Sequence, residues 1–281
     1  MIGGRLGCVL AGLLGTLSVG GAAGAEVSET PGRDLGRVSL GLGVDWSEGD
    51  YEGERSTDIL YGGLRLAYLT PELAFTPSLY DWLELQLTVS ALQVDGPAVV
   101  RRSSTGAGRP DTERSGGFGD LLLRGSYGFQ LARRGAWPYV ELAGQLKIPT
   151  ADEDEGLGTG EVDGTVELTV SQSWKGFSPF ASGARRFVGD PPGLNLDDRW
   201  LASAGASQRL FAGLGAGLFY DYRQAPSSGT DDAHALVAFF SWKRGSLRFS
   251  PYGLVGLSRG SPDFAVGAEL RFDVDLRSAG D

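Results

Sequence analysis

Residues 37–46 read Arg-Val-Ser-Leu-Gly-Leu-Gly-Val-Asp-Trp, with an apolar side chain at every second position from 38 to 46. The positions between them carry charged, polar or small residues. Because successive side chains of a β-strand point to opposite faces of a sheet, this spacing predicts a strand with one apolar face and one polar face.

The same alternation recurs clearly along the whole chain, and it predicts twelve strands. An even number is typical of bacterial single-chain membrane barrels. Within the second strand the apolar side chains switch from one face to the other across Thr70-Pro71. Proline has no N–H to donate to the hydrogen-bond ladder of a sheet, so we expect a bulge there. The predicted strands are 36–47, 57–78, 82–93, 117–131, 137–148, 163–174, 177–188, 199–209, 214–223, 232–242, 246–258 and 263–276.

The connections between these strands fall into two classes, which distinguishes a membrane barrel from a soluble sandwich. Short turns are expected at 79–81, 132–136, 175–176, 210–212 and 243–245, and longer loops at 48–56, 93–116, 149–162, 189–198, 224–231 and 259–262. The six tryptophans, at positions 46, 82, 137, 174, 200 and 242, fall close to strand ends. Short periplasmic turns, longer extracellular loops and aromatic girdles are typical of membrane barrels. We therefore predict an all-β, antiparallel up-and-down transmembrane β-barrel of about twelve strands.

The first 25 residues are expected to direct export and to be removed. Arg5 precedes an uncharged run, residues 6–25, that ends in small residues. A positive start, an apolar middle and a small-residue end predict a signal peptide at 1–25, followed by a single outer-membrane barrel domain at 26–281. A retained membrane anchor is the alternative, which the glycines in the run disfavour. Cys8 is the only cysteine, so the mature chain has no thiol for a disulfide or a metal.

The charge balance excludes one class of partner. Without the signal peptide the chain has 24 basic and 35 acidic residues, a formal charge of −11. Binding to nucleic acid needs a surplus of lysine and arginine for the phosphates, so we expect no nucleic-acid role. The longest uncharged stretch after the signal, residues 210–220, has 11 residues, whereas a membrane-spanning helix needs about 20.

Motifs in the middle of the chain resemble one protein family. They are Gly117-Phe118-Gly119-Asp120-Leu121, then Lys147-Ile148-Pro149-Thr150-Ala151-Asp152, then Gly156-Leu157-Gly158-Thr159-Gly160 with Asp163, and an early hairpin at 70–73 and 79–85. Together they are similar to the outer-membrane transporter family of the MetA pathway of phenol degradation, over about residues 60–190. The resemblance implies a barrel channel for small organic, often aromatic, molecules.

The polar face of each strand is expected to line the lumen of the barrel. Charges of both signs occur on it, which favours a slim, salt-bridged channel over a wide pore selective for one sign. Lys147 shares this face and is expected to pair with a lumenal acid such as Asp120, Glu141 or Glu167, the alternative being a rim lysine in water. The predicted pore-lining residues are Glu84, Asp120, Arg124, Glu141, Lys147, Glu167, Asp221, Arg223, Glu269 and Arg271.

A rim loop follows Lys147 in the sequence. Its glycines at 156, 158 and 160 could form a phosphate cradle, but no strand-then-helix context accompanies them, so a tight loop over the rim is favoured. The acidic run at 152–155 matches no calcium loop and is expected to be solvated. We predict no metal and no cofactor. The rim-loop motif comprises Lys147, Pro149, Thr150, Asp152, Gly158, Gly160 and Asp163.

These observations predict an outer-membrane channel for passive uptake or diffusion of small organic solutes, with no catalytic residue. The expected partners are outer-membrane lipid, lipopolysaccharide, the solutes and the barrel-assembly machinery. An outer-membrane hydrolase of phospholipase type is the enzymatic alternative, since such an enzyme sets a serine beside a histidine. His234 is the only histidine, and Ser203 or Ser241 would serve only if the fold brought one of them near it. A structural or adhesin barrel without an open pore is a further alternative.

Overall fold

The computed structural model describes residues 36–49, 55–69, 82–96, 113–130, 138–153, 155–191, 196–227 and 229–276. The predicted signal peptide at 1–25 lies outside these residues. No helix in the described part of the chain is long and apolar enough to cross a membrane. The strands are β1 (Gly36–Gly49), β2 (Arg55–Leu69), β3 (Trp82–Gly96), β4 (Glu113–Phe118), β5 (Leu121–Gln130), β6 (Tyr139–Ile148), β7 (Asp163–Ser171), β8 (Phe177–Phe187), β9 (Arg199–Phe211), β10 (Leu214–Arg223), β11 (Ala233–Arg244), β12 (Leu247–Gly256) and β13 (Phe264–Leu276).

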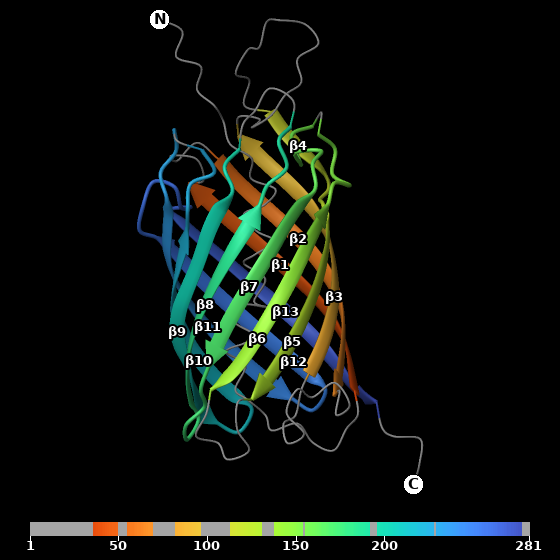
Figure 1. Ribbon diagram of the computed structural model, residues 1–281, viewed down its shortest axis with the longest axis vertical. Coiled ribbons are helices and arrows are strands. Elements are labelled where there is room, and N and C mark those ends of the chain that lie inside the picture. Colours follow the sequence, from red (N-terminus) through yellow and green to blue (C-terminus); the bar gives the residue numbers. More distant parts are fainter. Residues whose placement is uncertain are drawn as a thin grey trace, which may run out of the picture.

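These strands close into a barrel (Figure 1). Consecutive barrel strands pair antiparallel, and β1 pairs with both β2 and β13, so the sheet closes on itself. β4 and β5 both pair with β3 and are separated only by Gly119 and Asp120, so they are two pieces of one barrel strand. The barrel therefore has twelve strands, as predicted. The expected bulge at Thr70-Pro71 lies outside the described residues.

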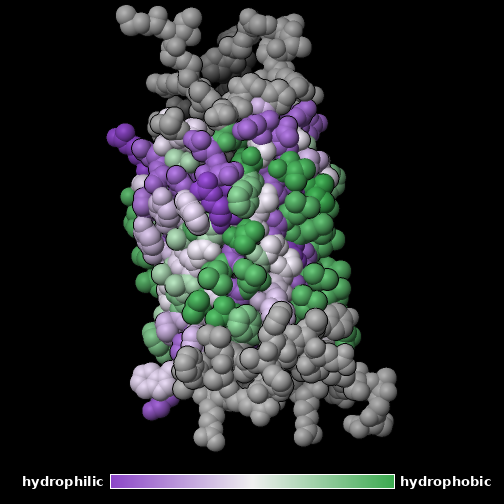
Figure 2. All heavy atoms as spheres, in the orientation of Figure 1, coloured by the Kyte–Doolittle hydropathy of each residue, from purple (hydrophilic) through white to green (hydrophobic). Residues whose placement is uncertain are grey.

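The outer face of the barrel is apolar and its inner face carries the charges. Leu42 is 57% exposed and Val166 is 51% exposed on the outside, whereas Lys147 and Arg271 on the inside are 4% and 6% exposed. In Figure 2 hydrophobic residues cover the right side and much of the lower part of the face shown, and hydrophilic residues gather toward its upper left. A protein surrounded by water would bury these side chains, whereas hydrocarbon stabilises them where they are. The predicted membrane-barrel fold is thus confirmed.

The two ends of the barrel differ in their connections. At the end where β1 begins and β13 ends, two residues suffice to join β9 to β10 and β11 to β12. At the opposite end the strands are joined by longer segments, among them 149–162, 188–198 and 224–232. We call the first the turn end and the second the loop end. These connections sort as predicted, and the predicted turns at 79–81 and 132–136 lie outside the described residues.

Tryptophans lie at both ends of the barrel. Trp46 and Trp200 lie at the loop end, and Trp174 and Trp242 lie toward the turn end. The guanidinium of Arg185 lies over the Trp200 ring, 5.0 Å from its centroid. Rings with an apolar body and a polar edge gather where hydrocarbon meets headgroups, so these positions mark the two boundaries of the membrane-spanning zone.

Candidate channel lumen and rim

The inner face of β5, β6 and β7 carries a connected ion cluster. The guanidinium of Arg124 lies 3.2 Å from Glu141 Oε1 and 2.7 Å from Glu167 Oε2. β6 pairs with both β5 and β7, so the three side chains come from neighbouring strands. A guanidinium offers five donors in one plane and can serve two carboxylates at once. Both glutamates were expected as partners of Lys147, and they bind Arg124 instead.

Lys147 is the centre of a second cluster, nearer the loop end. Its Nζ lies 3.4 Å from Asp120 Oδ2, 3.2 Å from Asp163 Oδ2 and 2.8 Å from Thr159 Oγ1. The predicted pairing with Asp120 is therefore present. The second carboxylate was missed as a partner, although Asp163 lies directly opposite Lys147 in the register of β6 and β7. All four side chains are buried, and a buried charge is tolerated only when it is paired and hydrogen-bonded.

The loop between β6 and β7, residues 149–162, folds onto this second cluster. Pro149 follows the last residue of β6, where the ladder ends. Asp120 Oδ1 then accepts hydrogen bonds from the backbone N–H groups of Thr150 and Ala151, both at 3.1 Å. The Thr150 hydroxyl also donates to the backbone oxygen of residue 119, at 3.0 Å. Asp120 thus binds Lys147 through one oxygen and the start of the loop through the other.

Leu157 anchors the far side of the same loop. Its side chain is 2% exposed, and a Cβ placed on Gly117 of β4 would lie 2.8 Å from Leu157 Cδ1. The Leu157 N–H donates to the backbone oxygen of Asp152, at 3.1 Å, which turns the loop back on itself. Gly160 has a φ of 72°, a conformation that glycine adopts without strain. Gly158 is buried in the same fold of the loop. The predicted rim-loop motif is therefore gathered into one compact unit.

The remaining predicted lining residues include two pairs on single strands. Arg223 Nε lies 2.7 Å from Asp221 Oδ2 on β10, and Arg271 Nε lies 3.2 Å from Glu269 Oε1 on β13. Side chains two residues apart point to the same face of a strand, which makes such pairs possible. Glu84 of β3 is half-buried on the same inner face. The structure thus places all ten predicted lining residues on the inside of the barrel.

Beside these charged pairs, the inner face of β8 and β10 to β13 carries a packed group of apolar side chains. The Phe219 ring lies with its centroid 5.9 Å from that of Phe180 and 6.2 Å from that of Phe239, in tilted and edge-on arrangements. Such separations are typical of favourable aromatic pairs. We call this surface the aromatic wall. It comprises Phe180, Phe219, Ala235, Val237, Phe239, Tyr252, Leu254 and Ala265.

Two glycines let rings of the aromatic wall approach the strands closely. A Cβ on Gly217 would lie 2.3 Å from Phe239 Cζ, and one on Gly267 would lie 2.6 Å from Tyr252 Cζ. The Tyr252 hydroxyl donates to the Asp45 carboxylate across β13, so the polar end of this ring has a partner. The rings therefore pack against the barrel backbone.

The aromatic wall was missed by the reasoning from sequence. That reasoning sought strands with one polar face, whereas β11 is apolar on both: Val237 and Phe239 point inward, and Leu236 and Phe240 point outward. The signal was present as the run 235–240, six residues without a polar side chain. Continuous apolar runs mark strands that are covered on both faces.

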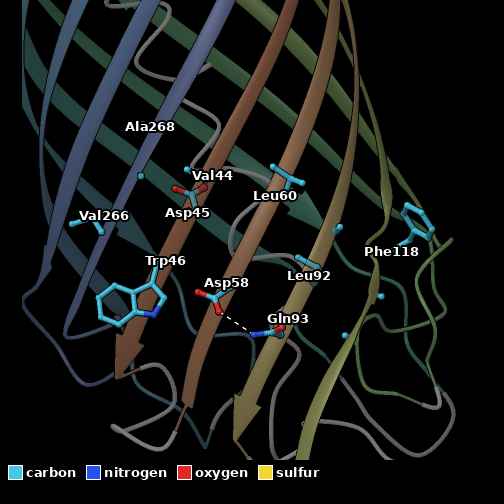
Figure 3. A pocket seen from close by; sticks show the side chains of 14 residues that line it. Val44, Asp45, Trp46, Asp58, Leu60, Leu92, Gln93, Phe118, Val266 and Ala268 are labelled. Atoms are coloured by element: carbon cyan, nitrogen blue, oxygen red, sulfur yellow. Dashed lines mark hydrogen bonds between the residues drawn. The ribbon is translucent and has the colours of Figure 1, made fainter.

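The outer wall carries a shallow depression near the loop end. Figure 3 shows its lining residues Trp46, Asp58 and Gln93 on the neighbouring strands β1, β2 and β3. Gln93 Nε2 donates to Asp58 Oδ2, at 3.2 Å, in the midst of apolar side chains such as Leu60 and Val266. A polar pair beside a girdle tryptophan suits the boundary between hydrocarbon and headgroups.

His234 lies on the outer face of β11 at the loop end. Its Nδ1 is 2.5 Å from the Tyr220 hydroxyl. Ser203 and Ser241, the serines considered for a hydrolase, hydrogen-bond to a serine of β8 and an arginine of β12. Among the described residues, no serine hydroxyl forms a hydrogen bond with the imidazole of His234, so a nucleophile–base pair is not assembled there.

The sequence model of the MetA-pathway of phenol degradation family matches residues 28–275. The chain belongs to this family. The predicted resemblance is therefore confirmed, and it extends well beyond the motifs that first indicated it. No curated protein sequence matches the chain.

Solved structures similar to this member of the MetA-pathway family are outer-membrane barrels. The COG4313 outer membrane channel from Pseudomonas putida F1 has a TM-score of 0.65 and 13% identity, covering 89% of this chain and 98% of that one. The translocator domain of the autotransporter NalP from Neisseria meningitidis has a TM-score of 0.50 and 10% identity, covering 94% and 97%. At such low identity the likeness shows the fold.

Three of the motifs that carry the resemblance to the MetA-pathway family meet at one place in the barrel. Segment 117–121 supplies Asp120, segment 147–152 supplies Lys147, and segment 156–163 supplies the rest of the rim loop with Asp163. Segment 117–121 lies about thirty residues before the other two in the chain, and all three converge on a single buried cluster, which explains why these residue types occur together.

Proposed function

We propose that this protein is an outer-membrane channel through which small organic solutes, aromatic ones among them, diffuse passively. The aromatic wall is the observation that carries the proposal. Apolar side chains on the inside of a barrel lose by contact with water and gain by contact with an apolar solute. Many of the inward charges are paired, in the clusters of Arg124 and Lys147 and in the pairs Asp221–Arg223 and Glu269–Arg271, so an apolar solute would meet few unpaired ones there.

The comparisons support the same proposal. The similar structure from Pseudomonas putida F1 is called an outer membrane channel, and the family description refers to phenol degradation. Residues 1–25 serve in this proposal as a cleaved signal peptide, and the barrel-assembly machinery inserts the single domain 26–281. The loop end then faces the cell exterior and contacts lipopolysaccharide, whereas the turn end faces the periplasm.

The test is conductance of the purified chain in planar bilayers, together with swelling of liposomes in phenyl glucoside and methyl glucoside. The two solutes share a polar body that keeps them from crossing lipid, and they differ in one aromatic ring. We expect conductance steps and entry of phenyl glucoside at least as fast as that of the smaller methyl glucoside. Absence of both conductance and swelling would favour a structural barrel. Conductance with exclusion of phenyl glucoside would refute the aromatic substrate class alone.

A further inference from the structure

We propose that loop 149–162 is a fixed lid that sets the largest solute admitted at the loop end, and that Lys147 holds it in place. The inference rests on the proposed channel function and deepens it by naming what limits solute size. The structure describes every residue of this loop except position 154.

The loop is much longer than the gap it bridges. It joins β6 to β7, whose facing residues Lys147 and Asp163 are direct partners in the sheet. A two-residue turn would close such a hairpin, and fourteen residues could extend roughly 46 Å if stretched. Instead the loop folds back onto the junction of β4 and β5 through Asp120 and onto β4 through Leu157.

The direction of this fold places the loop on the inside of the barrel. Gly117, which lies against Leu157, is directly opposite Leu92 in the register of β3 and β4. Partners in an antiparallel register share a face, and Leu92 has the same parity as buried Val94. Leu157 therefore lies on the inner side of the wall, and the loop that carries it narrows the mouth.

Two anchors of different chemistry hold the lid. The polar anchor is the buried cluster of Lys147 with Asp120, Asp163 and Thr159, in which Thr159 is itself part of the loop. The apolar anchor is Leu157. If the loop left the wall, Lys147 would lose the Thr159 hydroxyl and Asp120 would lose the two backbone N–H groups of residues 150 and 151. Breaking hydrogen bonds to buried charged groups is costly, so the loop cannot leave the wall cheaply. This is why we infer a fixed lid and not a freely moving one.

The experiment compares Lys147→Met with a version that carries an added crosslink, Lys147→Met with Gly117→Cys and Leu157→Cys. The mature chain has no other cysteine, so the new disulfide has no competitor. Conductance and liposome swelling are measured with mono-, di- and trisaccharides, before and after reduction. Gel mobility of unheated protein reports whether each barrel is folded.

We expect Lys147→Met to conduct more and to admit a larger saccharide than the unmodified chain. The oxidised crosslink should restore the original size limit, and reduction should abolish the restoration. Leu157→Ala removes the apolar anchor without changing a charge, so it tests the lid even if Lys147→Met does not fold. It should also raise the size limit. Lys175→Met in the turn at the opposite end is the matched control and should change neither quantity.

Two results would overturn the lid. One is a folded Lys147→Met or Leu157→Ala barrel with unchanged conductance and unchanged size limit. The other is an oxidised crosslink that leaves the enlarged limit in place. If neither the unmodified chain nor any variant conducts, the channel proposal itself fails, so the two failures are distinguishable.

Discussion

On β5 to β7 the inner face of the barrel holds Arg124 between Glu141 and Glu167, whereas on β10 and β11 the same face holds the packed rings of Phe219 and Phe239. Both sets are inward side chains of neighbouring strands in one closed sheet. The first set is held by charge pairing, in which every member needs its partners. The second is held by ring contacts, in which no member needs a particular partner.

The difference teaches how the two regions can share one lumen. A charged wall must be internally complete, because an unmatched charge loses hydration in a confined space. An apolar wall has no such requirement, and in the proposed channel it is the part of the inner face that an apolar solute would contact. The charged region therefore suits a structural role, and the aromatic wall suits contact with the solute in the proposed channel. The following substitutions test this division, in order of expected effect.

The largest effect is expected from Arg124→Met on the charged wall. The change leaves Glu141 and Glu167 without their cation, and breaking a buried ion pair costs about 3–5 kcal/mol. Urea unfolding of the barrel in lipid vesicles measures the loss. The control is Arg114→Met, which removes an exposed arginine 3.4 Å from Asp95 and should change the free energy of unfolding by less than about 1 kcal/mol. Equal effects of the two would contradict the structural role of the cluster.

A smaller loss of stability is expected from Gly217→Val on the aromatic wall. The new side chain would occupy the position of the Phe239 ring, and such overpacking costs about 1–3 kcal/mol. Gly144→Val is the matched control, since a Cβ at Gly144 meets nothing within 4 Å. The same unfolding measurement should show no loss for the control. A tolerated Gly217→Val would mean that the rings are not packed against the strands.

Phe219→Leu should alter selectivity more than stability. It keeps the wall apolar but removes an aromatic partner, and such ring contacts contribute about 1 kcal/mol. The ratio of phenyl glucoside to methyl glucoside entry should therefore fall about fivefold. Tyr220→Leu, on the outer face of the same strand, should leave this ratio unchanged. A ratio that moves in the control and not in Phe219→Leu would place the solute path elsewhere.

The smallest effect is expected from His234→Ala. This histidine contacts Tyr220 on the outer face and belongs to neither inner region. Conductance should stay the same, and the free energy of unfolding should change by less than about 0.5 kcal/mol. Vesicle lipids should remain intact with either protein. Lipid hydrolysis that disappears in His234→Ala would instead support the hydrolase alternative.

Much of the fold followed from local pattern, because strand periodicity is a property of adjacent residues. The alternation at 38–46 already indicated which side chains face outward. The lengths of the connections indicated that consecutive strands run up and down between two ends of a barrel. The contacts of the rim loop were predicted only in part. Asp120 was expected beside Lys147, but Asp163 and Thr159 were not, because the approach of Asp163 depends on the register of β6 and β7 and that of Thr159 on how the loop folds back.

The chain alone determined the strands, their two faces and the sorting of long and short connections, since each of these depends on spacing along the backbone. Only the tertiary structure decided which inward side chains meet. Closure of the sheet sets the register, and the register brings Glu141 and Glu167 to Arg124, Asp163 to Lys147, and Phe180 to Phe219. Contacts between strands depend on that register, which alternation along a single strand does not specify.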